Sequence, residues 1–153
     1  MSKVSIIIPI FNEEKLIGKL LNKLKKIKLI NNLKKEIICI NDGSDDNTLN
    51  ILKKYKFIKI INQKNYGKGF AVQQGIKQAT GKYVLIQDAD LEYDPDDINK
   101  LLKKIVGKTK VAVYGSRYKK VKILNKIFTK NQSFFAAIFN YFLTFFFYLK
   151  TRV

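Results

Sequence analysis

Four carboxylates follow an apolar run near the middle of the chain, each two residues after the one before. The run YVLI leads into QDADLEYDP, which contains Asp88, Asp90, Glu92 and Asp94. Side chains at i and i+2 of an extended strand point to the same side, so we expect the first two or three carboxylates to project together into a crevice. Such a group repels itself and is costly to desolvate unless a cation neutralises it.

A divalent metal ion is the cation that these residues favour. Oxygen ligands without histidine or cysteine select Mg²⁺ or Mn²⁺, and such ions commonly bind through one or two carboxylates together with substrate phosphates. We therefore interpret Asp88 and Asp90 as metal ligands, with a solvated acidic loop as the alternative. Asp94 is different, because it precedes Pro95 and fits the N-cap of a following helix.

The composition excludes several mechanisms. The chain of 153 residues contains no histidine, which rules out Ser-His-Asp catalysis, Cys-His catalysis and a histidine zinc site. The single cysteine, Cys39, lies in the apolar run EIICI. We expect it to be a buried core residue rather than a reactive thiol, in a protein of a reducing compartment. Acid–base or metal chemistry must therefore use carboxylates.

The charge balance is strongly basic. The sequence has 30 Lys and Arg residues against 12 Asp and Glu residues, a net charge of +18. This excess suggests an anionic partner such as a nucleotide or a phospholipid surface, although a biased amino-acid composition explains it equally well. The lysines are spread over the predicted helix faces and no nucleic-acid recognition module is present, so we do not expect nucleic acid as a partner.

Strand and helix patterns alternate along the first 115 residues. Apolar β-branched runs predict strands, and apolar residues at helical spacing predict the helices between them. The alternation predicts an α/β fold with a mostly parallel sheet and helices on both faces. Polar segments follow the strands, and ligands bind at the carboxyl ends of strands in such sheets. The predicted strands are 4–10, 36–40, 57–61, 82–87 and 111–115, and the predicted helices are 13–29, 48–55, 69–79 and 95–106.

Two further positions could contact a nucleotide. Asp42 follows the second predicted strand and precedes Gly43. Its carboxylate could accept hydrogen bonds from a base N–H or a ribose hydroxyl, or it could be a turn residue. Gly67, Lys68 and Gly69 match neither a Walker loop nor a GxGxxG fingerprint. They indicate only a close backbone approach with a lysine near phosphate.

Five segments together resemble a known family. VSIIIPIFNEE, NDGSDD, NYGKGFAVQQG, QDADLEYDP and VYGSRY, in this order and spacing, are similar to family 2 glycosyltransferases of the GT-A fold. The similarity is greatest to the branch that transfers sugars to dolichol or polyprenol phosphate. It covers residues 3–118 and implies a Rossmann-like three-layer α/β/α architecture. Two positions depart from the family: Asn41 replaces the first Asp of the usual DDGS, and Phe11 stands where Tyr is usual.

The resemblance implies roles for individual residues. Asp88 and Asp90 would form the DxD pair of the family, with Asp88 contacting both nucleotide and metal, and Glu92 would approach the metal. Arg117 would face phosphate and would be a catalytic residue together with Asp88 and Asp90. The residues expected at the nucleotide are Pro9, Phe11, Glu13, Asp42, Asp88, Lys68 and Ala71, and those expected at the acceptor phosphate are Ser116, Arg117 and Lys130.

The implied reaction is the inverting transfer of a sugar from a nucleotide diphosphate sugar, UDP- or GDP-linked, with the help of Mg²⁺ or Mn²⁺. A hydroxyl acceptor needs a general base. A polyprenyl or dolichyl phosphate is already an anion and needs none, so the lack of histidine is compatible with a lipid phosphate. A family 2 transferase that extends a glycan and a truncated nucleotide-binding domain without catalysis are the alternatives.

We expect two regions in the chain. Residues 1–118 would form the nucleotide-sugar-binding domain, and residues 119–153 a basic, aromatic-rich segment close to the acceptor and the membrane. Residues 134–149 carry no charge, but this run is shorter than the roughly 20 residues that a membrane crossing needs. The short length favours an interfacial helix or a core helix. The family normally continues further, so we expect a truncated acceptor half, and a peripheral or anchored protein at the cytoplasmic face of a membrane.

Overall fold

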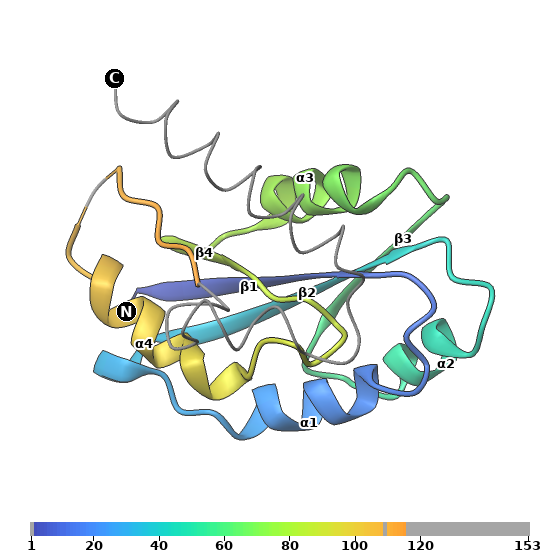
Figure 1. The fold of residues 1–153 in the computed structure, drawn as a ribbon, viewed down its shortest axis with the longest axis horizontal. Helices are drawn as coiled ribbons and strands as arrows, with labels where there is room; N and C mark the ends of the chain where they lie inside the picture. Colours follow the sequence, from blue (N-terminus) through green and yellow to red (C-terminus); the bar gives the residue numbers. More distant parts are fainter. Residues whose placement is uncertain (1, 109, 116–153) are drawn as a thin grey trace, which may run out of the picture. The chain divides into compact units, whose positions relative to one another are not determined.

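A computed structural model describes residues 2–108 and 110–115. The chain divides into two compact units, Met1–Val113 and Tyr114–Val153. The described residues lie almost entirely in the first unit, whose helices and strands are labelled in Figure 1.

The first unit is built on a four-stranded sheet with the strand order β3-β2-β1-β4. All pairings are parallel, so the carboxyl ends of the strands meet at one edge. The register places Ile7 beside Ile38 on one side and beside Ile86 on the other, which puts β1 at the centre. The strands are β1 (Lys3–Ile10), β2 (Lys34–Asp42), β3 (Lys59–Gln63) and β4 (Tyr83–Ile86).

Helices cover both faces of this sheet (Figure 1). The helix α3 lies on one face, and α1, α2 and α4 lie on the other. This arrangement confirms the predicted α/β class and its three layers. The helices are α1 (Ile17–Lys26), α2 (Thr48–Lys53), α3 (Lys68–Gln78) and α4 (Ile98–Ile105), with short 3-10 turns η1 (Ile30–Asn32) and η2 (Pro95–Asp97).

The alternation of side chains along β1 divides the core into two clusters. Ile6 and Ile8 pack in the same cluster as Leu20 of α1, whereas Ile7 packs with Ala71 of α3. Each of these side chains is fully buried. Burying an isoleucine contributes about 1.5–3 kcal/mol, so the two faces of one short strand hold both helical layers in place.

Gly75 allows α3 to lie close to the sheet. A Cβ atom at Gly75 would lie 2.3 Å from Cγ2 of Ile7 and 2.9 Å from Cδ1 of Ile40, inside van der Waals contact. A glycine within a helix costs about 1 kcal/mol relative to alanine. The predicted helix nevertheless continues through Gly75, because the packing against the sheet requires that position to be empty.

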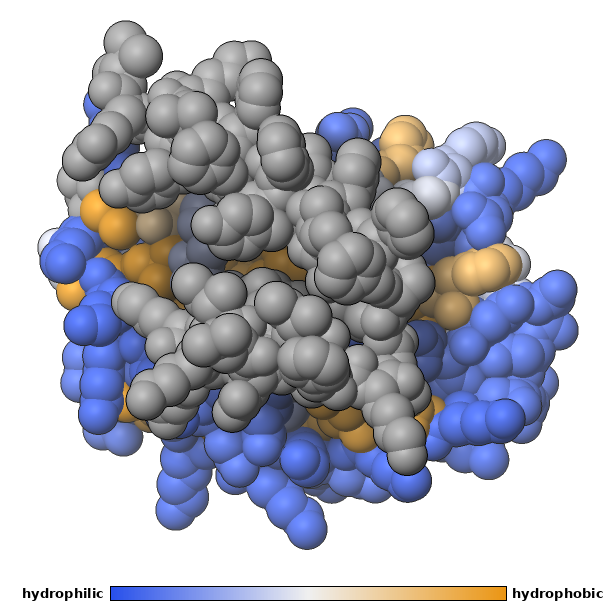
Figure 2. Space-filling model, viewed as in Figure 1, coloured by the Kyte–Doolittle hydropathy of each residue, from blue (hydrophilic) through white to orange (hydrophobic). Residues whose placement is uncertain are grey.

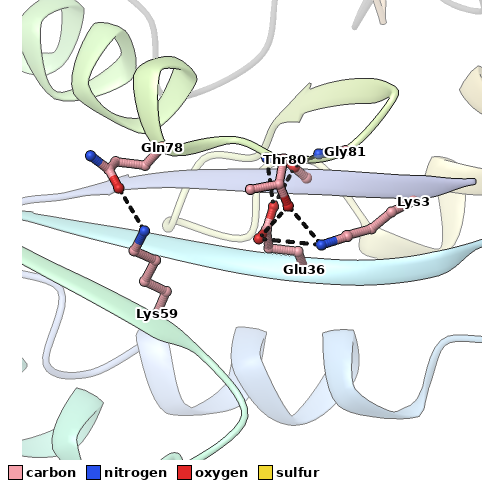
Figure 3. Close-up of polar contacts among 7 residues, drawn as sticks. Lys3, Glu36, Lys59, Gln78, Thr80 and Gly81 are labelled. Atoms are coloured by element: carbon pink, nitrogen blue, oxygen red, sulfur yellow. Dashed lines mark hydrogen bonds and ion pairs between the residues drawn. The ribbon is translucent and has the colours of Figure 1, made fainter.

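A polar cluster ties the amino end of the sheet together (Figure 3). Glu36 of β2 accepts hydrogen bonds from Oγ of Ser5 at 2.6 Å and from the N–H and hydroxyl of Thr80 at 3.1 and 2.9 Å. Oγ of Ser5 accepts the N–H of Gly81 at 2.8 Å, and Nζ of Lys3 lies 3.7 Å from Glu36. Burial disfavours the charged carboxylate, but these partners outweigh it and lower the pKa of Glu36. This Glu36 cluster holds the turn between α3 and β4 against β1 and β2.

A lysine caps the C-terminus of α1. The ammonium of Lys35 donates to the backbone carbonyls of Leu24, of Lys25 at 2.8 Å and of Ile27 at 2.6 Å. A cation at this end complements the helix dipole and satisfies carbonyls that the helix leaves unpaired. Burial lowers the pKa of Lys35, which shows that the ammonium is partly desolvated by this contact.

The structure differs from the sequence-based prediction at one strand and several boundaries. Residues 111–115, predicted as a strand, form none in the described part of the chain, and Val111 is 47% exposed. That prediction is wrong, because a β-branched run forms a strand only where a neighbour pairs with its backbone. The first helix begins at Ile17 rather than 13, and the third strand at Lys59 rather than 57. Cys39 is fully buried and burial raises its pKa, which confirms a core residue.

The described surface is rich in hydrophilic residues. They dominate the lower and right-hand margins of the face drawn in Figure 2. Within residues 2–108 and 110–115, no helix has both the length and the apolar character needed to span a membrane. Residues 134–149, predicted as an interfacial helix or a core helix, lie outside the described residues.

Candidate functional site

A cavity of about 170 Å³ lies at the carboxyl ends of the strands, where ligands bind in open parallel sheets. Its walls come from the ends of β1 and β2, the start of α3 and the segment after β4. Seven residues predicted for the nucleotide and the metal meet here, together with two that were not predicted. The predicted ones are Pro9, Phe11, Glu13, Asp42, Lys68, Asp88 and Asp90, and the others are Ile10 and Ala89.

The remaining predicted residues lie elsewhere. Ala71 is fully buried in α3, where it packs on the sheet, and it does not line the cavity. Glu92 is exposed and is also outside the lining. Ser116, Arg117 and Lys130 lie outside the described residues, so their roles stay predictions.

Asp42 fixes the loop between β3 and α3. Its Oδ1 accepts hydrogen bonds from Nε2 of Gln63 at 2.7 Å and from the N–H of Tyr66 at 3.0 Å, and its Oδ2 accepts the N–H of Gly67 at 2.9 Å. The side chain therefore organises a loop that is distant in the sequence, in addition to ending its own strand. Oδ2 retains capacity for a second donor, so a nucleotide could still bind there. Contact between Asp42 and a nucleotide stays a prediction.

Asn41, one of the two departures from the family pattern, makes a cross-strand contact. Its Nδ2 donates to Oδ1 of Asn62 at 2.6 Å, and the two residues are opposite each other in β2 and β3. An ionised aspartate at this position could only accept a hydrogen bond. The asparagine donates to its neighbour in β3, and the departure removes no residue from the lining of the cavity.

Glu13 anchors the turn after β1. Its N–H donates to Oγ1 of Thr48 at 2.9 Å, and its carbonyl accepts the N–H of Ile17 at 3.0 Å where α1 begins. Burial raises the pKa of the Glu13 carboxyl, and the negative charges of Asp90 and Asp46 raise it further. Burial is the main cause of this shift, and two neighbouring carboxylates add to it.

Asp88 and Asp90 lie on a turn beyond the end of β4. Gln87 begins this turn by donating its N–H to the carbonyl of Ile7 at 2.9 Å. The Gln87 side chain, 4% exposed, donates to the carbonyls of Asp88 at 3.2 Å and Tyr93 at 3.1 Å. A braced turn, rather than the extended strand that we expected, brings both carboxylates to the cavity. Sequence reasoning misses Gln87, although an amide directly after an apolar strand is a signal for such bracing.

The rest of the acidic segment is also part of a turn. Oδ1 of Asp90 accepts the N–H of Glu92 at 3.0 Å, and Leu91 between them has a φ of +62°. In the part of the chain that the structure describes, no three side chains among Asp, Glu, Cys and His are grouped to hold a metal ion. Asp88, Asp90 and Glu92 therefore do not form a three-carboxylate group here, and their metal-binding role stays a prediction.

A lysine is the partner of Asp88. Nζ of Lys68 lies 2.7 Å from Oδ1 of Asp88, whose side chain is 19% exposed, whereas that of Lys68 is 64% exposed. Asp88 already contacts the ammonium of Lys68, but the carboxylates around the cavity outnumber this one lysine. Their oxygen atoms are the donors that a hard divalent cation prefers. Among the described residues that line the cavity, Lys68 is the only cation, beside the carboxylates of Glu13, Asp42, Asp88 and Asp90.

Comparison with known proteins identifies the family that the chain resembles. The sequence profile of glycosyl transferase family 2 matches residues 5–152. An uncharacterized protein of Methanocaldococcus jannaschii is 37% identical over 143 residues, which are 86% of this chain and 58% of that protein. The undecaprenyl-phosphate 4-deoxy-4-formamido-L-arabinose transferase of Proteus mirabilis is 36% identical over 109 residues, which are 67% of this chain and 33% of that enzyme. The chain therefore spans less than two thirds of either relative.

A solved structure has the same architecture. The crystal structure of S. aureus TarS 1–349 in complex with UDP has a TM-score of 0.53 and 35% sequence identity, over 57% of this chain and 27% of that one. This likeness confirms the GT-A fold expected from the sequence. The profile covers nearly the whole chain, and all residues predicted for the nucleotide except Ala71 line one cavity. The chain belongs to glycosyl transferase family 2.

Proposed function

We propose that the protein transfers a sugar from a UDP- or GDP-linked nucleotide diphosphate sugar to a polyprenyl or dolichyl phosphate. The observation that carries the proposal is the cavity at the carboxyl ends of the strands, which gathers seven residues expected for this reaction. Family membership supports the transferase chemistry. The UDP complex of TarS supports a nucleotide-linked donor, and the name of the Proteus relative supports a lipid phosphate as acceptor.

The nucleotide would lie between the end of β1 and the loop held by Asp42. Phe11 is 47% exposed beside the cavity and offers an aromatic face to a base. Asp42 fixes the backbone of Tyr66 and Gly67, and α3 begins at the next residue, Lys68. The buried Asp42 would thereby determine where Lys68 lies relative to a bound diphosphate.

Asp88 and Asp90 would hold a divalent cation, Mg²⁺ or Mn²⁺, with Glu92 as a further candidate ligand. The ion, when bound, supplies positive charge that offsets the charge of the departing diphosphate. The buried side chain of Gln87 keeps the turn that presents both carboxylates. Four carboxylates line the cavity beside one lysine among the described residues, and such a cation would balance part of their charge.

The acceptor phosphate would attack the anomeric carbon from the face opposite the leaving diphosphate, which inverts the configuration. A phosphate monoester is already anionic near neutral pH, so no residue has to remove a proton from it. This is consistent with a sequence that contains no histidine. Ser116, Arg117 and Lys130 are the residues that we propose to bind this phosphate, with the planar guanidinium of Arg117 suited to two parallel hydrogen bonds.

A lipid-linked acceptor requires the protein to work at a membrane surface, and we propose the cytoplasmic face. Residues 1–118 would bind the donor, and residues 119–153 would lie close to the acceptor and the bilayer. The net charge of +18 supports attraction to anionic lipids. Sedimentation with anionic vesicles should carry the protein down at low salt, whereas neutral vesicles should leave it in solution.

A transfer assay tests the proposed reaction. The protein is incubated with polyprenyl phosphate, Mn²⁺ and labelled UDP- or GDP-sugars, and label is counted in the organic phase. We expect one nucleotide sugar to yield labelled lipid, and Asp90→Ala to abolish that yield. Asp96→Ala is the matched control, because it removes an exposed carboxylate that does not line the cavity.

Other outcomes would identify the alternatives. Label that enters a glycan and never the organic phase would replace the lipid acceptor with a growing sugar chain. Thermal stabilisation by UDP or GDP with Mn²⁺, without transfer from any nucleotide sugar, would indicate a nucleotide-binding domain that does not catalyse.

A further inference from the structure

We propose that Lys68 is an internal counter-ion that competes with the divalent cation for Asp88 and leaves it when a nucleotide diphosphate binds. This inference rests on the proposed function, because it concerns the same cavity. It assigns to Lys68 a positioning role that links the binding of metal to the binding of nucleotide.

The first step is the contact between Lys68 and Asp88. Nζ of Lys68 lies 2.7 Å from Oδ1 of Asp88, and both residues line the cavity. A metal ion bound to the same oxygen would lie about 2.1 Å from it. An ammonium and a divalent cation at these distances from one atom repel each other strongly. Binding of the ion to Oδ1 therefore requires the ammonium to move away.

The second step is that Lys68 can move while its backbone cannot. Asp42 holds the N–H of Gly67, and the carbonyl of Gly67 accepts the N–H of Ala71 in the first turn of α3. The Lys68 side chain is 64% exposed, whereas the side chain of Asp88 is 19% exposed. The flexible four-carbon stem of lysine therefore pivots on a fixed helix start, and the carboxylate stays where it is.

The third step is the destination of the ammonium. Lys68 is the first residue of α3, and the N-terminus of a helix favours negative charge. A diphosphate bound beside Asp88 in the proposed reaction brings phosphate oxygens to this place. Lys68 would exchange one carboxylate oxygen for a phosphate oxygen, so its charge remains paired throughout. Asp88 then becomes available to the cation at the moment when the diphosphate arrives.

The consequence is positive coupling between the two ligands. Without nucleotide, the ion must displace Lys68, which weakens its binding. With nucleotide, the lysine has a better partner and the ion finds Asp88 vacant. A lysine that merely binds phosphate would strengthen nucleotide binding, but it would not weaken the binding of the ion alone. Affinity for the metal in the absence of nucleotide therefore separates the two roles.

The experiment measures Mn²⁺ binding without any turnover. Free Mn²⁺ is followed by electron paramagnetic resonance in titrations of the full chain, first alone and then with saturating UDP or GDP. Lys68→Gln removes the counter-ion, and Lys77→Gln removes an equal charge from the exposed far end of the same helix. Lys68→Arg keeps a cation beside Asp88. Circular dichroism verifies that every variant is folded.

We expect Lys68→Gln to bind Mn²⁺ alone about 5–10-fold more tightly than the wild type, because the competing cation is absent, while Lys77→Gln and Lys68→Arg stay within about twofold. With nucleotide present, the advantage of Lys68→Gln should disappear. Equal or weaker binding of Mn²⁺ alone by Lys68→Gln, relative to Lys77→Gln, would overturn the inference, and so would absence of Mn²⁺ binding in all variants. Failure of the proposed reaction would show differently, as intact coupling without labelled lipid.

Discussion

The two ends of the sheet both carry glutamates close to other polar groups, but they treat the charge in opposite ways. At the amino end, the hydrogen bonds to Glu36 from Ser5 and Thr80 outweigh burial and lower its pKa. At the carboxyl end, burial and the negative charge of Asp90 raise the pKa of Glu13. One end stabilises an ionised carboxylate with the protein's own donors. At the other end, four carboxylates and a single lysine line the cavity among the described residues.

Two lysines show the same contrast. Lys35 donates to backbone carbonyls at the end of α1, and these hydrogen bonds hold its ammonium in place. Lys68 contacts one carboxylate and is largely exposed. Equal charges thus serve different purposes: the first completes a helix, and the second occupies a position that a ligand can take.

The largest expected effect comes from breaking the carboxyl end. Asp90→Ala should lower sugar transfer at least about 100-fold, because one of the two proposed metal ligands is lost. The thermal unfolding midpoint should fall by no more than about 2 °C, since the change also removes a like charge near Glu13. Transfer to lipid and the unfolding midpoint are measured in the same preparation, beside Asp96→Ala. Transfer at the wild-type rate would contradict the assignment.

Breaking the amino end should have the reverse profile. Glu36→Ala should reduce the free energy of unfolding by about 2 kcal/mol, because it leaves the donors of Ser5 and Thr80 without their partner. The affinity for Mn²⁺ and nucleotide should be unchanged in the folded protein. Urea denaturation at pH 7 measures the loss.

The pH dependence of Glu36 provides its control. The pKa of Glu36 is lower in the folded state, so its contribution is complete above its ordinary value of 4.5 and is lost as the pH falls through the folded value. Wild type and Glu36→Ala should therefore differ most near neutral pH and approach each other in acid. An equal difference at every pH would indicate a packing defect instead.

Lys35→Met should have a smaller effect that is confined to stability. Loss of the ammonium at the end of α1 should cost about 1 kcal/mol, and urea denaturation measures it. Lys34→Met is the matched control, because Lys34 is the exposed neighbour whose side chain makes none of these contacts. Equal losses in the two variants would show that the carbonyl contacts contribute nothing.

Glu13→Gln should have the smallest effect and the opposite sign. The pKa of Glu13 is raised, so its charged form is disfavoured in the folded protein and its contribution improves as the pH falls through the raised value. The variant should therefore be more stable than the wild type at pH 7, by about 0.5 kcal/mol or less because the group is partly exposed. The gain should vanish below pH 4.5. A gain that persists in acid would argue against charge repulsion.

The sequence predicts most of the fold because the signals are local. Four apolar runs correspond to the four strands, and the helical spacing of Leu20 and its neighbours corresponds to a helix between two of them; the runs lie around Ile7, Ile38, Ile60 and Val84. Family resemblance also predicts which side chains line the cavity. The geometry that positions those side chains is not local, and it could not be predicted.

Three contacts illustrate this limit. Gly67 donates its N–H to Asp42, and Lys68 forms an ion pair with Asp88. Each contact joins residues far apart in the chain, so no local sequence pattern predicts it. The apolar run YVLI coincides with β4, but the chain turns after it instead of continuing as a strand, because the Gln87 side chain donates to the carbonyls of Asp88 and Tyr93.

The strand order β3-β2-β1-β4 also bears on how the protein is made. The first three strands of the sequence are synthesised together and can pair as soon as they emerge. Until β4 arrives, the backbone edge of β1 that will pair with it is unpaired. Such an edge can pair with other chains. The cavity needs Asp88 and Asp90, which follow that last strand. A nucleotide can therefore stabilise only the finished sheet, and it cannot protect the open edge of β1 before β4 docks.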